Sequence, residues 1–396
     1  MSIVSRTVWV LSLVSLFTDI ASEMLYPVMP IYLQSIQFSV VFIGILEGLA
    51  EAVAGLSKGY FGKLSDDKQT RLPFVRSGYF LSALSKPLMA AFTIPIWVFA
   101  VRTLDRLGKG IRTGARDAML SSESTPQTKA RVFGFHRSMD TLGAVCGPAV
   151  ALLFLYLYPG SYKLMFVIAF FPGVAAIGLT FLLKENKPSL AADKRTGLLD
   201  FIKYVRQSPR HYQRLLAGLL MFALINSSDV FLLLKIKQAT GSDTATIGCY
   251  IFYNLVYAAL SYPLGALADK IGLKQIFTAG IFVFACVYGL MATAKNIYVF
   301  AAALTLYGVY AAATEGISKA WISNVVNKND TATAIGSYTA FQSICALLAS
   351  SLVGLIWAKF GGSSALLVSA VGAVITAVYM LFFTTNPNMH HPLPNS

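Results

Sequence analysis

Two pairs of carboxylic acids stand one helical turn apart within apolar stretches near the N-terminus. Asp19 and Glu23 form the first pair, and Glu47 and Glu51 form the second. Residues four apart share a face of a helix, so each spacing places two carboxyls side by side. Two like charges this close in a low dielectric cannot both ionise easily, so one takes up a proton near neutral pH. We therefore predict proton coupling at these four acids, with permanent salt bridges as the structural alternative.

A basic stripe follows in a later apolar stretch. Charged residues recur there at intervals of three or four, along roughly 20 Å of one helical face: Arg102, Asp105, Lys109, Arg112 and Arg116. An ionisable group at mid-bilayer persists where it faces a cavity, finds a partner or does chemistry. The stripe either neutralises the acids as an internal network or binds an anionic group such as a carboxylate or phosphate. Arg106 and Lys109 are the substrate-binding candidates here, with Asp105 beside them.

Other polar side chains in apolar stretches add to the candidates. His136 lies one turn from Asp140, where the two could pass a proton or form a static salt bridge. The second half of the chain has fewer charges and more tyrosines. A cavity with one charged and one aromatic wall would suit an amphipathic substrate with an acidic end, and packing or interfacial roles are the alternative. The remaining substrate-binding candidates are Tyr26, Asp229, Tyr253, Tyr257 and Glu315.

No known catalytic pattern accompanies these residues. The sequence has no Gly-rich phosphate loop, no zinc-ligand cluster and no nucleophile elbow, which argues against ATP-driven pumping and hydrolysis. The four cysteines fall in separate apolar stretches without metal-ligand spacing. We therefore expect no enzyme activity, no cofactor and no metal site.

The elements that position these residues are membrane spans. The 396-residue chain is 56% hydrophobic and only 13% charged, which is too apolar for a soluble protein of this length. A helix needs about 20 apolar residues to cross a bilayer. Hydropathy and helix breakers divide the chain into twelve such spans, near residues 7–33, 39–63, 72–92, 95–118, 129–157, 162–183, 212–238, 243–268, 273–294, 296–325, 331–359 and 363–384.

The distribution of Lys and Arg predicts the topology. The formal net charge is +14, but the cations lie in connecting loops rather than in a nucleic-acid-binding motif, so we expect no nucleic acid partner. Lys58, Lys63, Lys68, Arg71 and Arg76 surround the second loop, whereas the first loop has no Lys or Arg. By the positive-inside rule, the even-numbered loops and both termini are cytoplasmic. We expect a multi-pass protein of the cell inner membrane.

A duplication divides the chain into two halves. Gly62-Lys63-Leu64-Ser65-Asp66 after the second span returns as Gly265-Ala266-Leu267-Ala268-Asp269 after the eighth. The longest connection, 184–211, is basic and contains an amphipathic stretch, which predicts a linker along the inner surface. We therefore predict an all-α membrane protein with twelve transmembrane helices in two pseudo-symmetric six-helix bundles, at residues 1–183 and 212–396.

Three motifs resemble those of the major facilitator superfamily, and the resemblance covers essentially the whole chain. Arg102-x-Leu104-x-x-x-Gly108-x-Gly110 is similar to the family's second motif, with Asp105-Arg106 in place of the expected Gln-Gly. Gly143-x-x-x-Gly147-Pro148 is similar to the motif of its antiporters, in which glycines four apart let helices approach closely and a proline bends the helix at the interface between the bundles; a tightly packed helix is the alternative. The family's loop motif is degraded after Asp66 and nearly complete at Gly265, Leu267, Ala268, Asp269, Lys270, Gly272 and Lys274.

The resemblance implies roles for several charged residues and glycines. It places Arg102 near proton coupling. It also implies that Arg112 and Arg116, near the predicted cytoplasmic end of their span, act in gating, because the family's loop acid often pairs with neighbouring helices. The gating or conformational candidates are Asp66, Arg112, Arg116, Asp140, Gly143, Gly147, Pro148, Gly265, Asp269 and Lys270.

The expected function is secondary transport. We predict a carrier closest to the drug/metabolite:proton antiporter branch, which exports a small, anionic or amphipathic molecule by proton-coupled alternating access. Proton-coupled import of a metabolite or metal chelate is the alternative direction. A non-concentrative receptor or lipid-handling protein on the same scaffold is the alternative of another class. The family implies a monomer, and the expected partners are the substrate, protons and the lipid bilayer.

Overall fold

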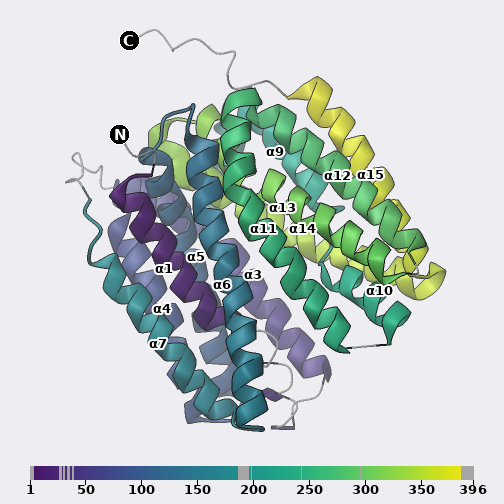
Figure 1. Ribbon diagram of the computed structural model, residues 1–396. Coiled ribbons are helices and arrows are strands. Elements are labelled where there is room, and N and C mark those ends of the chain that lie inside the picture. Colours follow the sequence, from purple (N-terminus) through teal and green to yellow (C-terminus); the bar gives the residue numbers. More distant parts are fainter. Residues whose placement is uncertain are drawn as a thin grey trace, which may run out of the picture. The chain divides into compact units, whose positions relative to one another are not determined.

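Regular secondary structure in the described part of the chain is helical. The computed structural model describes residues 4–25, 29, 32–33, 36–37, 40–185, 196–197, 199–241, 243–294 and 296–384, and no strand occurs among them. Figure 1 shows helical ribbons in both halves of the sequence. A helix satisfies its backbone hydrogen bonds within one segment, which is what a membrane span requires.

The helices are continuous over most of the predicted spans. The first half of the sequence forms α1 (Arg6–Glu23), α3 (Val40–Asp67), α4 (Leu72–Ala91), α5 (Pro95–Ser122), α6 (Lys129–Leu157) and α7 (Tyr162–Thr180). A short helix, α8 (Asp200–Gln207), follows in the predicted linker. The second half forms α9 (Arg210–Ala223), α10 (Val230–Thr240), α11 (Asp243–Ile271), α12 (Leu273–Thr293), α13 (Ile297–Val325), the 3₁₀ helix η1 (Lys328–Asp330), α14 (Thr331–Phe360) and α15 (Gly362–Phe383).

The seventh predicted span, 212–238, is two helices rather than one. Helix α9 ends at Ala223, and α10 begins at Val230. The intervening sequence contains Asn226-Ser227-Ser228-Asp229, whose side chains compete with the helix for backbone hydrogen bonds. The backbone N–H of Ser228 donates to Ser350 Oγ at 3.1 Å, so a neighbouring helix satisfies part of the interrupted backbone.

Seven segments among the described residues are long and apolar enough to cross a membrane. They begin in α6, α7, α11, α12, α13, η1–α14 and α15. Helix α5 contains the charged stripe, and α9 and α10 are each shorter than a full span. Every one of the twelve predicted spans nevertheless overlaps at least one described helix.

The chain forms two compact units. Unit 1 comprises Met1–Glu123, His136–Val205 and Lys328–Ile344, and unit 2 comprises Ser124–Phe135, Arg206–Asn327 and Cys345–Ser396. Two helices contribute to both units. The start of α6 belongs to unit 2 and the rest of it to unit 1, whereas the start of α14 belongs to unit 1 and the rest of it to unit 2. The division at the 184–211 linker stays a prediction.

Each unit has an aromatic and aliphatic core. In unit 1 the ring of Tyr32 packs edge-on against Phe166 with centroids 4.9 Å apart. Both belong to a buried cluster with residues of α4, α5, α6 and α7. In unit 2 Phe222 contacts Phe284 and Tyr310, at centroid distances of 5.1 and 5.8 Å. These cores hold in place the helices that position the polar residues.

Candidate functional site: a charged cavity and two helix-capping loops

A polar cavity of about 190 Å³ lies within unit 1. Helices α1, α4 and α5 supply its walls, and cationic side chains outnumber acidic ones among the residues that line it. This cavity brings together predicted proton-coupling residues of α1 with the predicted stripe of α5. Its lining comprises Asp19, Ser22, Glu23, Ser82, Arg102, Asp105, Arg106, Lys109 and Arg112.

Asp105 is held by a cation that the sequence analysis did not single out. Lys86 on α4 donates to Asp105 Oδ1 at 2.8 Å, and Ser85 Oγ lies 3.2 Å from the same oxygen. The guanidinium of Arg102 lies 3.8 Å from Asp105 Oδ2. Lys86 is 4% exposed, so this ion pair is almost fully withdrawn from water. Asp105 therefore balances cations of the protein, and the signal that could have revealed the pair is a lysine inside an apolar span.

A second acid, outside the cavity lining, lies beside Asp19 of the cavity wall. The Asp140 carboxyl of α6 lies next to the Asp19 carboxyl of α1. Ser15 Oγ donates to Asp140 at 2.5 Å, and Arg137 Nη1 donates to its other oxygen at 2.6 Å. Like charges this close in a low dielectric repel each other, so the predicted sharing of a proton between neighbouring acids extends to this pair.

Two glycines of α6 let α1 approach closely enough for this pair to form. A Cβ atom at Gly143 would lie 2.7 Å from the carbonyl oxygen of Leu16 and 2.8 Å from Asp19 Cβ. A Cβ at Gly147 would lie 2.7 Å from the backbone nitrogen of Met24. The predicted close approach thus occurs between α6 and α1. Pro148 follows directly inside α6.

The remaining arginines of the stripe have different partners. Arg112 lines the cavity, donates to Ser82 Oγ at 2.6 Å and lies 4.5 Å above the Tyr79 ring. Arg116 donates twice to Asp117 Oδ1, at 3.0 and 2.9 Å. Asp117 is fully buried and was not singled out from the sequence, since it lies beside the stripe rather than on it.

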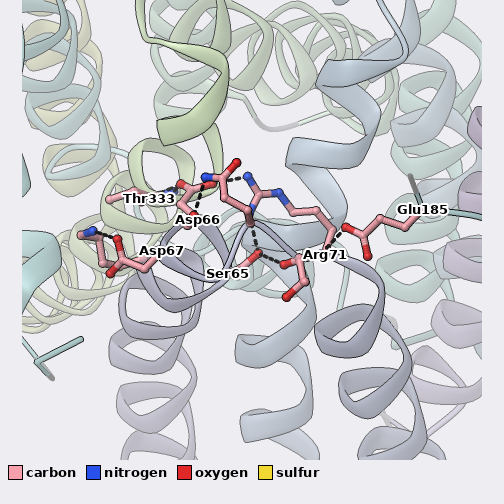
Figure 2. A network of polar contacts seen from close by, with 9 residues as sticks. Ser65, Asp66, Asp67, Arg71, Glu185 and Thr333 are labelled. Carbon is pink, nitrogen blue, oxygen red and sulfur yellow. Dashed lines mark hydrogen bonds and ion pairs between the residues drawn. The ribbon is translucent and has the colours of Figure 1, made fainter. Parts of the chain in front are cut away.

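The loop acid Asp66 caps the start of α14 within unit 1. Figure 2 shows Asp66 between Arg71 and Thr333. The Thr333 backbone N–H and hydroxyl donate to Asp66 Oδ2 at 2.5 and 2.6 Å, and Arg71 pairs with the other oxygen. A carboxylate at a helix N-terminus satisfies N–H groups that have no partner within the helix.

The same network anchors the ends of two neighbouring segments. Glu185 accepts from the backbone N–H groups of Arg71 and Leu72 at 2.5 and 2.9 Å, and so caps α4 (Figure 2). Thr196 Oγ1 donates to Asp67 at 2.8 Å, and Lys63 pairs with the same carboxylate. The degraded half of the repeated motif therefore makes an extensive polar network.

Asp269 makes the equivalent cap in unit 2. Its two oxygens accept from the backbone N–H groups of Ala130 and Arg131 at 2.9 and 3.0 Å, at the start of α6. A Cβ at Gly265 would lie 2.4 Å from the Ala130 carbonyl oxygen, so the helices touch backbone to backbone here. The adjoining Lys270 is exposed. Each copy of the loop motif thus caps one helix of its own unit.

Asp66 should make the stability of the protein depend on pH. Asp66 lies beyond the expected span 39–63. Burial raises the pKa of its carboxyl to about 6, because the opposing effects of Arg71 and Thr333 are smaller. The folded state then binds this proton more tightly than the unfolded state, so stability falls as pH rises from about 4 to about 6. The melting temperatures of wild type and Asp66→Asn are measured at pH 7 and at pH 5. Relative to the variant, the wild type should be more stable at pH 5 than at pH 7. A shift in the opposite direction would mean that the Arg71 ion pair outweighs burial.

The predicted residues of the second half lie in unit 2. The Tyr253 hydroxyl donates to Asp229 Oδ2, and the rings of Tyr250 and Tyr307 lie 5.5 and 5.2 Å from that of Tyr253. Tyr257 is buried on α11, and Glu315 is half-buried on α13. The structure thus joins Asp229 to an aromatic cluster.

Three predicted residues fall outside the described structure. Tyr26 is not among the described residues, and Glu47 and Glu51 lie in α3 but their side chains are not described.

His136 is buried beside the Asp140 network. Among the described residues, no group of three or more His, Cys, Asp or Glu could hold a metal ion.

Comparison with known proteins identifies the family of this chain. Residues 11–252 and 215–396 match the family model of the Major Facilitator Superfamily. The chain belongs to this superfamily. An uncharacterised MFS-type transporter of Methanocaldococcus jannaschii, MJ1317, is 31% identical over 387 residues, which cover 96% of this chain and 95% of that protein. The multidrug resistance protein MdtH of Edwardsiella ictaluri is 25% identical over 242 residues, 60% of this chain and 58% of that protein.

Solved structures of the superfamily share the fold. The human organic anion transporter MFSD10 superposes with a TM-score of 0.77 at 15% identity, over 95% of this chain and 99% of that one. The transporter FucP in its outward conformation gives a TM-score of 0.78 at 13% identity, over 97% and 100% of the two chains. This superfamily member is therefore a multi-pass membrane transporter of small molecules with an all-α, two-domain fold, and not an enzyme.

Proposed function

We propose that this transporter exports a small anionic or amphipathic compound across the cell inner membrane, by proton-coupled alternating access. The observation that carries the proposal is the unit 1 cavity, where two carboxyls of α1 and several cations of α5 share one small space. Such a site holds both the coupling ion and the means to recognise a negative charge.

The anion-binding part is the set of cations that line the cavity. Asp105 is engaged by Lys86, so it does not neutralise the whole stripe. Lys109 is exposed in the cavity wall, and the Arg112 guanidinium is oriented by Ser82 and Tyr79. Guanidinium and ammonium groups bind carboxylates and phosphates through charge-assisted hydrogen bonds. An acidic group of the substrate would therefore bind between Lys109 and Arg112, and Arg106 lines the same cavity.

The proton-binding part is the Asp19–Asp140 pair. Loss of the shared proton would leave two adjacent carboxylates that repel each other and would change the charge of the cavity wall. The glycine contacts couple this pair to the packing of α1 on α6. Protonation could therefore bias the arrangement of these helices, which is what a coupled carrier needs.

Export is the direction supported by the α6 motif and by relatives. MdtH is named a multidrug resistance protein, and a relative in Lactococcus lactis is named a multidrug efflux pump homologue. Import by proton–anion symport is the second candidate, and the shared cavity favours it. Asp19 and Lys109 line the same small space, so a proton taken up by Asp19 would remove a negative charge near Lys109 and favour an anion there, and proton and anion would then bind together.

A comparison of small molecules inside cells and in their medium tests the proposal. We would measure both by mass spectrometry at two external pH values, with wild type, Asp19→Asn and the matched surface variant Asp200→Asn. We expect a compound that moves outward with wild type and Asp200→Asn, faster at acidic external pH, and is not moved by Asp19→Asn. Inward accumulation at acidic pH would establish symport instead. No difference from cells without the protein would favour a receptor.

A further inference from the structure

An apolar groove lies between α4 and α7 in unit 1, separate from the charged cavity. Its volume is about 340 Å³. The side chains along it are exposed: Phe80 is 51%, Val174 is 44% and Phe181 is 66% exposed. All of its lining residues are apolar, so it suits hydrocarbon. They are Phe80, Leu84, Phe170, Val174, Ile177, Gly178 and Phe181.

The spacing of these residues makes the groove follow both helices lengthwise. Phe80 and Leu84 are four apart and share one face of α4, and that face continues one turn earlier to Arg76. On α7, a Cβ atom at Gly178 would meet nothing within 4 Å, so this glycine keeps the groove open. The groove is therefore an elongated slot with a cation on the same face.

Arg76 has hydrogen-bonding capacity that the described protein does not use. Its guanidinium lies 4.9 Å above the Phe181 ring, and Nη2 is 3.5 Å from the Thr180 carbonyl oxygen. Its Nε is buried and has no hydrogen-bond partner among the described residues. The one protein hydrogen bond described for the outer part of the guanidinium is the long contact of Nη2, so this half-buried group keeps N–H donors for an anionic ligand.

A second cation follows three residues after Phe181, the ring that Arg76 covers. Lys184 is exposed at the end of the segment that follows α7. The neighbouring acid, Glu185, is occupied by the backbone N–H groups of Arg71 and Leu72. In the predicted topology this end faces the cytoplasm, where anionic lipids give the membrane surface a negative potential.

We propose that the groove binds one anionic phospholipid. An acyl chain lies along Phe80, Val174 and Phe181, and the phosphodiester accepts hydrogen bonds from Arg76. The headgroup charge is stabilised by Lys184. This lipid site does not depend on the transported substrate, because none of its residues lines the charged cavity.

Native mass spectrometry of the purified full chain tests the site. The protein is equilibrated with equal amounts of phosphatidylglycerol and phosphatidylcholine of the same acyl chains. We compare wild type with Arg76→Gln, Gly178→Leu and the matched control Gly289→Leu, whose Cβ also meets nothing within 4 Å. Wild type and Gly289→Leu should retain phosphatidylglycerol preferentially. Arg76→Gln should lower that preference about fivefold, and Gly178→Leu should lose bound lipid of both kinds.

Three outcomes would overturn the lipid site. The first is equal retention of the two lipids by wild type, and the second is unchanged lipid retention in both groove variants. The third is a wild-type dimer that Gly178→Leu abolishes, because a second copy of the chain would then cover the groove. Cross-linking of wild type with a phosphatidylglycerol that carries a photoactivatable acyl chain avoids any folding defect of the variants. Cross-links should map to α4 and α7 around Phe80 and Phe181, and cross-links spread evenly over all helices would contradict the proposal.

Discussion

Replacement of Lys86 by methionine should destabilise the protein by about 3 to 5 kcal/mol. The change removes the ammonium that lies 2.8 Å from Asp105 Oδ1 and leaves a buried carboxylate short of positive charge. We expect the variant to be recovered in low yield and to unfold at a much lower temperature in detergent than wild type. Thermal unfolding followed by intrinsic fluorescence measures this difference.

The double variant Lys86→Met, Asp105→Leu separates the charge effect from packing. A buried ion pair can often be replaced by apolar side chains of similar volume with little loss of stability, because desolvation offsets much of the attraction between the charges. The double variant should therefore recover most of the stability that the single change removes. If the double variant is as unstable as Lys86→Met alone, the pair is not the reason that Lys86 matters.

The second large effect is expected at Gly143. Alanine at this position places Cβ 2.7 Å from the Leu16 carbonyl oxygen and 2.8 Å from Asp19 Cβ, so α1 must move away from α6. Overpacking of this kind costs about 1 to 3 kcal/mol. The displacement also separates the Asp19–Asp140 pair, so we expect proton-driven transport to fall about a hundredfold. Uptake or efflux in proteoliposomes under an imposed pH gradient measures the loss.

Gly248→Ala is the matched control for this substitution. Gly248 lies in α11, and its Cβ would meet nothing within 4 Å. Both changes raise helix propensity by about 1 kcal/mol, so the control should be neutral or slightly stabilising. Similar behaviour of the two variants would show that the close approach of α1 and α6 is not required for coupling.

The sequence predicts the helical spans well because burial in a bilayer leaves a strong local signal. The bounds of most helices agree with the predicted spans within a few residues, as at α6, which runs from Lys129 to Leu157. Helix α5 continues to Ser122, beyond its predicted end at 118. Its last turns carry charged and polar residues, so hydropathy alone does not mark them as part of the helix. The interruption before α10 had a visible signal in Asn226-Ser227-Ser228-Asp229, but the apolar residues on both sides concealed it.

The partners of the charged residues were harder to predict, because spacing along one helix does not show which other helix lies opposite. The i, i+4 spacing placed Asp19 beside Glu23, and both line the cavity, but it could not indicate Asp140 of α6, which also lies next to Asp19. The sequence predicts Asp105 as a substrate-binding residue, which stays a prediction, but the spacing along α5 gave no sign of the ion pair with Lys86 of α4. The glycine spacing of α6 did predict close packing, because a row of residues without side chains lets the backbone of another helix approach.

The anchors at Glu185 and Thr196 have a practical consequence for protein engineering. Glu185 caps α4 and Thr196 bonds to Asp67, so the chain is tied to unit 1 on both sides of the ten intervening residues. Doubling the length of a closed loop costs only about 0.6 kcal/mol. A short affinity tag inserted between these two anchors should therefore leave the folded helices undisturbed, and would give access to the carrier without altering either terminus.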